Sequence, residues 1–284
     1  MKESHSIIVC FKKLLLSSLP YFKGSWFLYT KIFKLMPNEH RIFKIDDSLI
    51  SLDLTDPPQF TMARLRKGIT EPATTDFIKE HLKEGDIFMD IGANWGYFTC
   101  LASKIVGDDG LVVSIEPVKK TYWRLLDTMS RNWLFNVIAF NAALSDGHGD
   151  LVDFEKSWYR QSTSAFMKEG RKEGNIRTLT GDWIVENINT ANRKIQIVKI
   201  DVEGAELKVL KGLQNTLASF SPFFILEAGD YHNRYGYTFQ DLKDFMRQFS
   251  YNPTVILDDF NAVASTCYDN GCSISGNVIF SKVE

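Results

Sequence analysis

Short apolar runs alternate with segments of helical periodicity between residues 86 and 250. The apolar runs predict buried strands, and the segments between them predict helices. This alternation is typical of a parallel sheet that helices cover on both faces. We therefore predict an α/β, Rossmann-like fold with a seven-stranded, mostly parallel sheet. The strands are expected at 87–91, 111–115, 136–142, 195–200, 223–226, 253–257 and 277–280, the last of them antiparallel.

The chain before this alternation divides into two parts. Residues 1–40 form a basic, aromatic extension that we expect to be helical. Residues 41–84 contain alternating apolar residues, which predict a β-hairpin, and then a helix at 74–82 with Thr74 or Thr75 as its cap. Residues 85–284 form the main domain, in which the polar segment 157–175 is expected to be a loop over the site.

The turn after the first core strand carries the clearest chemical signal. Asp90-Ile91-Gly92-Ala93-Asn94-Trp95-Gly96 follows an apolar run and precedes an apolar helix at 97–106. Small residues let a ligand approach the backbone, and unpaired amides at the helix start point toward it. An acid stands where the dinucleotide fingerprint has its first glycine, which disfavours a pyrophosphate and a nicotinamide dehydrogenase. The acid suits a ligand with an ammonium group and hydroxyls, such as S-adenosylmethionine.

Four predicted strands end in an acid, at Asp90, Glu116, Asp201 and Glu227. Parallel strands place these ends along one edge of the sheet, so the acids are expected to converge on one crevice. Glu116 follows the glycine turn at the spacing that lets one carboxylate accept both hydroxyls of a ribose.

Several polar residues near these strand ends have open roles. Asp146 can accept the exocyclic amine of adenine or form a turn. Asp201 can act as the general base or hold the cofactor's ammonium group, and Glu203 can cap the next helix. Glu227 and His232 are further candidates for the base. We predict no metal site, because their spacing matches no tight metal motif, although a divalent metal stays an alternative.

Two stretches of the chain resemble motifs of the FkbM family of S-adenosylmethionine-dependent methyltransferases. They are the glycine turn, continued to Thr99, and the stretch Val198-Lys199-Ile200-Asp201-Val202-Glu203-Gly204-Ala205-Glu206. Ala143-Leu144-Ser145-Asp146 and Val209-Leu210-Lys211-Gly212 match further motifs of that family. The resemblance implies the class I methyltransferase fold. The expected cofactor-binding residues are Asp90, Gly92, Ala93, Asn94, Gly96, Thr99, Glu116, Pro117, Ser145, Asp146 and Asp201. The expected catalytic residues are Asp201, Glu227 and His232.

The resemblance also implies methylation of a hydroxyl on a sugar, a glycan or another small molecule. A sulfonium already makes the methyl group electrophilic, so such a protein mainly aligns the acceptor oxygen in line with the leaving sulfur. We expect an O-methyltransferase; N-methylation of an amine or peptide, and cofactor binding without turnover, are the alternatives. The chain has no Walker lysine and no nucleophile elbow, which disfavours phosphoryl and acyl transfer.

Charge is spread unevenly along the chain. The net charge is -2, but residues 1–44 hold eight basic and two acidic residues. This overall balance disfavours a nucleic-acid partner. The longest uncharged run in residues 6–36 is nine residues, too short to span a bilayer. We favour helices that pack on the domain or close over the site, in a cytoplasmic protein. Peripheral membrane contact through residues 1–40 is the alternative.

Overall fold

The computed structural model describes residues 40–45, 47–53, 71–156, 165–168, 175–188, 193–228, 230–257 and 276–283. Residues 1–39, which the sequence assigns to a helical extension, lie outside the described residues. Among the described helices, none combines the length and the apolar content that a bilayer crossing requires.

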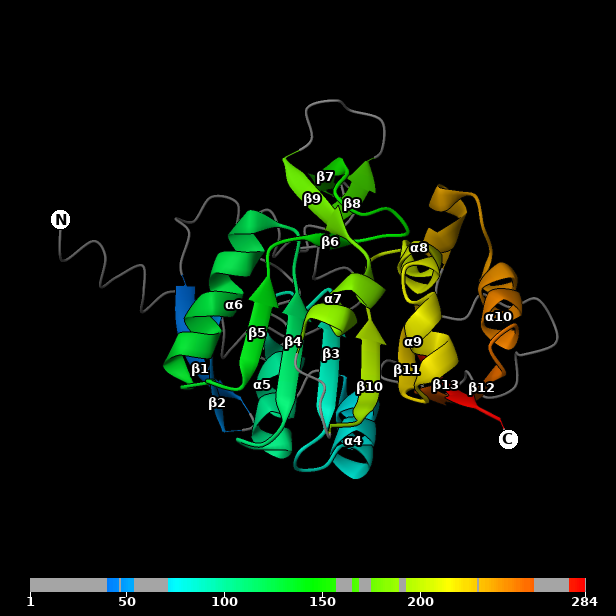
Figure 1. Ribbon diagram of the computed structural model, residues 1–284. Coiled ribbons are helices and arrows are strands. Elements are labelled where there is room, and N and C mark those ends of the chain that lie inside the picture. Colours follow the sequence, from blue (N-terminus) through cyan, green and yellow to red (C-terminus); the bar gives the residue numbers. More distant parts are fainter. Residues whose placement is uncertain are drawn as a thin grey trace, which may run out of the picture.

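A seven-stranded sheet forms the centre of the fold, in the order β12-β13-β11-β10-β3-β4-β5 (Figure 1). The strands from β11 to β5 pair in parallel, whereas β13 runs antiparallel to both β11 and β12. The predicted mostly parallel sheet is therefore confirmed. Its strands are β3 (Ile87–Ile91), β4 (Leu111–Ile115), β5 (Val137–Phe140), β10 (Ile195–Ile200), β11 (Phe223–Ala228), β12 (Tyr251–Leu257) and β13 (Gly276–Lys282).

One face of the sheet is covered by α4 (Pro72–His81), α5 (Tyr97–Val106) and a hairpin of β1 (His40–Ile45) and β2 (Ser48–Asp53). The hairpin was predicted, and so was α5, whose observed bounds are those expected from the sequence. The predicted cap of α4 is wrong, because the helix begins earlier with Pro72 in its first turn. Thr74 and Thr75 are instead buried inside the helix.

The other face is covered by α7 (Gly181–Asn187), α8 (Glu206–Lys211), α9 (Gln214–Ser219) and α10 (Phe239–Arg247). In Figure 1, α7 and α9 lie in front of the sheet and α5 lies behind it. The chain after β10 forms two separate helices, α8 and α9. The first ends at Gly212, where an added Cβ would lie 2.2 Å from the carbonyl oxygen of Ser145.

A second sheet has the order β6-β9-β7-β8 and lies beyond the carboxyl ends of the parallel strands (Figure 1). Its strands are β6 (Ala143–Leu144), β7 (Leu151–Lys156), β8 (Ala165–Lys168) and β9 (Ile176–Leu179). The expectation of a loop over all of 157–175 is wrong at β8, which pairs with β7 so that Met167 stands opposite Phe154. The rest of that predicted loop, 157–164 and 169–174, lies outside the described residues.

Candidate functional site

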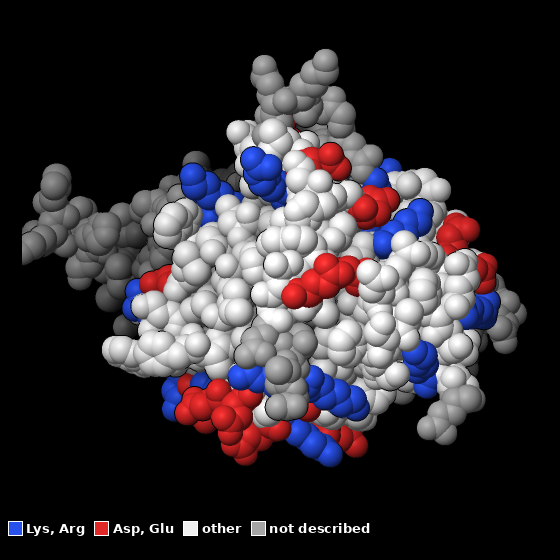
Figure 2. Space-filling model, in the orientation of Figure 1, with Lys and Arg blue, Asp and Glu red and all other residues white. Residues whose placement is uncertain are grey.

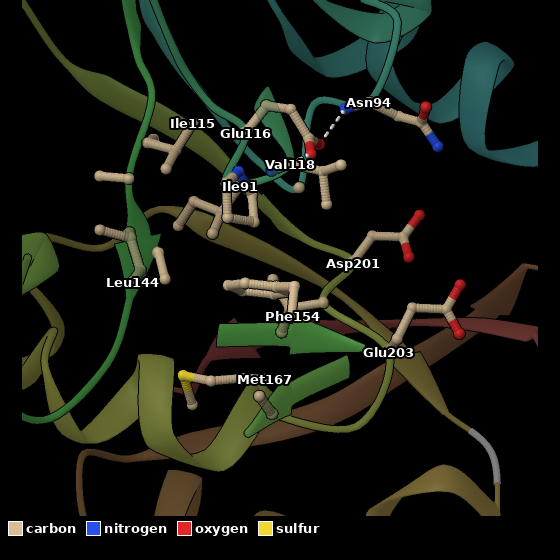
Figure 3. Close-up of a pocket in the computed structure, with 16 residues that line it drawn as sticks. Ile91, Asn94, Ile115, Glu116, Val118, Leu144, Phe154, Met167, Asp201 and Glu203 are labelled. Atoms are coloured by element: carbon tan, nitrogen blue, oxygen red, sulfur yellow. Dashed lines mark hydrogen bonds between the residues drawn. The ribbon is translucent and has the colours of Figure 1, made fainter. Parts of the chain in front are cut away.

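A cavity of about 660 Å³, counted with its open mouth, lies at the carboxyl ends of β3, β4 and β10. Figure 3 shows carboxylates and an amide on one side of it and apolar side chains on the other. The polar side comprises Asn94, Glu116, Asp201 and Glu203, and the apolar side includes Ile91, Leu144, Phe154 and Met167. Open parallel sheets bind ligands at this edge. A cavity therefore lies at the predicted edge, but of the four acids expected to converge there only Glu116 and Asp201 line it.

Glu116 lies at the end of β4 as a buried carboxyl group on the cavity wall. Its Oε2 accepts the amide of Asn94 at 3.0 Å, drawn in Figure 3, and its Oε1 accepts the amide of Val118 at 2.8 Å. Burial raises the pKa of Glu116 to about 7, although both amides act to lower it. Each carboxylate oxygen keeps a second lone pair. Glu116 can therefore accept two hydroxyl groups from a ligand.

The amides of the glycine turn are used inside the protein. Gly92 and Ala93 donate to the carbonyl of Ile115 at 2.9 and 3.0 Å, and Gly96 donates to the carbonyl of Ala93 at 2.9 Å. The end of β4 therefore takes two amides of the turn; the amides at the start of α5, which the sequence predicts to point at a ligand, are a separate set. Gly92 has φ +85°, and an added Cβ would lie 1.9 Å from the carbonyl oxygen of Asp201. This glycine is needed so that two strand ends can approach each other.

Asp90 lies beneath the rim of the cavity and does not line it. Its Oδ2 accepts the hydroxyl of Thr99 at 2.6 Å, and Thr99 also bonds Ser114 at 2.8 Å. Burial raises the pKa of Asp90, whereas Lys199 and Thr99 act to lower it. The structure thus places Asp90 and Thr99 as supports of the turn, together with Ala93 and Gly96, which also do not line the cavity.

Asp201 faces the cavity and is paired with a buried lysine. The Nζ of Lys199 lies 2.7 Å from the Oδ2 of Asp201, and this lysine side chain is only 2% exposed. Burial alone would lower the pKa of Lys199, but the carboxylates of Asp201, Glu71 and Asp90 outweigh it and raise the pKa. The lysine therefore stays charged and fixes the Asp201 carboxylate at the cavity.

A buried carboxylate at Glu206 holds the loop that follows Asp201. Its Oε1 accepts the amides of Val202 at 3.2 Å and Gly204 at 3.1 Å. Its Oε2 lies 3.1 Å from Nδ1 of His232 and 3.3 Å from the hydroxyl of Tyr237. The helix cap predicted for Glu203 is wrong, since α8 has Ala205 at its N-cap and no side-chain cap bond. Glu206 instead pairs with the loop's amides.

The two other predicted bases do not line the cavity. His232 is buried against Glu206, and its ring stacks on Tyr237 with centroids 5.1 Å apart. Burial and the charges of Asp201 and Glu203 raise the pKa of Glu227, near the end of β11, well above the ordinary carboxyl value. Of the three candidates, Asp201 alone faces the cavity. In the described part of the chain, no three His, Cys, Asp or Glu side chains form a group that would hold a metal.

The remaining predicted cofactor residues also divide into one that lines the cavity and two that do not. Pro117 lines the cavity. Ser145 is buried and donates its hydroxyl to the exposed Asp146 at 3.0 Å, and neither lines the cavity.

Sequence reasoning missed Lys199, Glu206, Phe154 and Met167. A charged residue inside the apolar run 195–200 was a signal for a buried ion pair at Lys199. Glu206 stands among apolar and small residues in the same motif and carried a weaker signal of this kind. Phe154 and Met167 gave none, because their placement depends on the pairing of β7 with β8.

The strand order, with one antiparallel strand inside a parallel sheet, and the acids at its carboxyl edge define a class I methyltransferase fold. Residues 90–253 match the methyltransferase FkbM domain, and the chain belongs to that family. The match covers both the glycine turn and the Asp201–Glu206 loop.

A curated relative and two solved structures resemble the chain. Hexuronic acid methyltransferase AglP of Haloferax volcanii is 34% identical over 165 residues, which are 58% of this chain and 64% of AglP. Methyltransferase FkbM from Methylobacillus flagellatus is 14% identical over 73% of this chain and 50% of that structure, with a TM-score of 0.43. TYW2 of M. jannaschii in complex with AdoMet is 15% identical over 87% and 89%, with a TM-score of 0.42.

Proposed function

We propose that the protein is an S-adenosylmethionine-dependent methyltransferase that methylates a hydroxyl group of a sugar or glycan. The observation that carries the proposal is the placement of Glu116 and Asp201 on one cavity of a chain that belongs to the FkbM family. The carboxylate of Glu116 suits the hydroxyl groups of a ribose, and the carboxylate of Asp201 can take a proton from an acceptor.

The residues present fit this cofactor. Glu116 has lone pairs for two ribose hydroxyls beside the amides of Asn94 and Val118. The apolar wall that includes Leu144, Phe154 and Met167 suits a flat base. When bound, S-adenosylmethionine supplies a methyl group on a sulfonium, which makes a single in-line displacement sufficient.

Asp201 takes the acceptor proton in this proposal. Its carboxylate faces the cavity and is held by Lys199 at 2.7 Å, so its position is fixed before an acceptor binds. Asp201 would accept the proton that the acceptor hydroxyl loses when its oxygen takes the methyl group and the bond between that methyl group and sulfur breaks. A positioned base of this kind contributes on the order of 10²–10⁴-fold to a rate.

The name of the relative supports a sugar acceptor. AglP is a hexuronic acid methyltransferase, and the matched region includes 58% of this chain. An amine acceptor, and retention of the cofactor without turnover, are the rival functions that the test must separate.

The test is a methyl-transfer assay with labelled S-adenosylmethionine and panels of neutral sugars, uronic acids and amines, read by mass spectrometry and by NMR of the product. We expect an added methyl on a sugar oxygen. The Asp201→Asn variant should keep its affinity for S-adenosylhomocysteine and lose turnover about 100-fold or more. Products only from the amine panel would contradict the proposal, and so would loss of cofactor affinity in Asp201→Asn.

A further inference from the structure

The residue directly before α4, Glu71, has a strained backbone. Its φ is +45°, in the left-handed region that a side chain as large as glutamate rarely adopts. Asn94 and Glu203, which line the cavity, share this region with φ +51° and +56°. Because strained positions of this kind gather at functional sites, Glu71 is a candidate for a role at the same edge of the sheet.

The side chain of Glu71 is used away from its own helix. Glu71 is the N-cap residue of α4, but it makes no side-chain cap bond. Its Oε2 instead accepts the side-chain amide of Asn277 in β13 at 2.8 Å, and the same amide nitrogen donates to Oγ1 of Thr74 at 2.8 Å. Asn277 is buried, and two acceptors match the two hydrogens of its amide. The carboxylate of Glu71 is therefore held in one direction.

Lys199 and Asn277 point to the same face of the sheet. Ile197 and Ile279, each two positions away on β10 and β13, pack in the core beneath α4 and α5. Side chains alternate along a strand, so Lys199 and Asn277 share the face of these two isoleucines. The Nζ of Lys199 lies 4.7 Å from the ring centroid of Phe98 in α5, which agrees with this placement.

Two carboxylates act on the buried ammonium group of Lys199. After Asp201, the carboxylate of Glu71 does most to raise the pKa of Lys199, ahead of that of Asp90. An ammonium group weakens a neighbouring carboxylate as a base, because it favours the charged form. A second carboxylate on the same ammonium group offsets part of that effect. Asp201 also interacts with the charges of Asp90, Glu116 and Glu227, which the test below leaves unchanged.

We propose that Glu71 is a positioning residue for methyl transfer, which acts through Lys199 to keep the Asp201 carboxylate in place and basic. This inference rests on the proposed function, since it takes Asp201 as the base. Glu71 itself does not line the cavity, so it should affect turnover and leave cofactor binding unchanged. Asn277 supports the arrangement from β13 by fixing the direction of the Glu71 carboxylate.

The kinetic test compares Glu71→Gln, Asp201→Asn and the double variant under saturating S-adenosylmethionine. Glutamine keeps an oxygen for Asn277 but removes the charge. We expect Glu71→Gln to lower kcat about tenfold without changing KM for S-adenosylmethionine, which is part of what a positioned base contributes. Glu71→Asp keeps the charge and should recover part of the loss. In the Asp201→Asn background, Glu71→Gln should cause no further loss, because the two residues act as one unit.

A matched control is Glu80→Gln, which removes an exposed carboxylate from the last turns of α4. In Figure 2, charged side chains gather at the lower edge of the view, where α4 ends. The loss of one charge from such a solvated surface has little effect, so this variant should have the wild-type kcat.

Urea unfolding gives a readout that is independent of activity. Glu71→Gln should lower the urea midpoint of the wild type and should not lower that of Lys199→Met, in which the charge pair is already absent. No fall in the wild type, or an equal fall in both backgrounds, would overturn the proposal even if no acceptor is found. So would a wild-type kcat in Glu71→Gln, or a tenfold loss that persists in Asp201→Asn. Full turnover by Asp201→Asn alone would instead contradict the proposed base, so the two failures are distinguishable.

Discussion

The Nζ of Lys199 lies 2.7 Å from the Oδ2 of Asp201. The two residues are two positions apart at the carboxyl end of β10, so their side chains lie on the same side of the strand. The lysine is enclosed beneath the cavity, with its Nζ 4.7 Å from the ring centroid of Phe98. The carboxylate is 31% exposed and faces the cavity. A buried cation thus fixes the one candidate base that the cavity can reach.

Replacing Lys199 with methionine should destabilise the fold. The change keeps most of the side-chain volume but leaves Asp90 and Asp201 without their shared cation, and breaking a buried pair typically costs about 3–5 kcal/mol. Because Asp201 is partly exposed, we expect a loss of about 3 kcal/mol in the free energy of unfolding, measured with urea. The control Lys194→Met, at an exposed position just before β10, should change it by less than about 0.5 kcal/mol. A loss below about 1 kcal/mol in Lys199→Met would contradict the pairing.

Alanine substitutions at Gly92 and, as a control, at Gly85 test the close approach of Gly92 to the Asp201 carbonyl. Both have a left-handed backbone, φ +85° and +84°, but a Cβ on Gly85 would meet nothing within 4 Å. Gly85→Ala should therefore cost only the backbone strain, about 1–2 kcal/mol. Gly92→Ala adds a collision with the Asp201 carbonyl, so we expect a further loss of stability and a loss of cofactor affinity. Equal urea midpoints for the two variants would show that the collision is relieved.

The carboxyl group of Glu116 predicts a pH dependence of nucleoside binding. Burial raises its pKa to about 7, and nearby Asp90 and Asp201 also act to raise it. The free protein therefore holds a proton there below pH 7, whereas the form that accepts two ribose hydroxyls is the carboxylate. Affinity should fall about tenfold from pH 8 to pH 6, with release of a proton on binding.

Calorimetry with 5′-methylthioadenosine measures this effect, because that nucleoside carries no amino acid group that titrates. Two buffers of different ionisation enthalpy give the number of protons released. Glu116→Gln should bind weakly at both pH values with a flat profile. A wild-type affinity that is the same at pH 6 and pH 8 would rule out the role of Glu116.

The hydroxyl of Tyr237 should stabilise the loop after Asp201. It accepts the amide of Leu207 at 3.1 Å and donates to the carbonyl of Gly204, both in a buried setting. Tyr237→Phe leaves these two groups unpaired, and we expect a loss of about 1–3 kcal/mol together with a lower turnover. Tyr122→Phe also removes one hydroxyl, which donates to the Ala139 carbonyl at 3.2 Å in a partly exposed place. A Tyr237→Phe variant as stable as Tyr122→Phe would contradict the role of this cluster.

The sequence predicted the central sheet because burial on both faces makes strands such as β3 and β4 continuous apolar runs. It placed Glu116 and Asp201 on one cavity because parallel strands end at one edge. It could not tell that Asp90 lies beneath that edge, since side-chain direction at a strand end depends on neighbouring strands. Three strands of the small sheet, β6, β8 and β9, were missed because they are short and form only by pairing with distant partners.

The most direct test of the account is a crystal structure of the protein with S-adenosylhomocysteine. We predict that both ribose hydroxyls donate to the carboxylate of Glu116, that the base lies against the wall that includes Phe154 and Met167, and that the sulfur faces the Asp201 side. A bound nucleoside that makes no contact with Glu116, or crystals that bind none under saturating ligand, would contradict it.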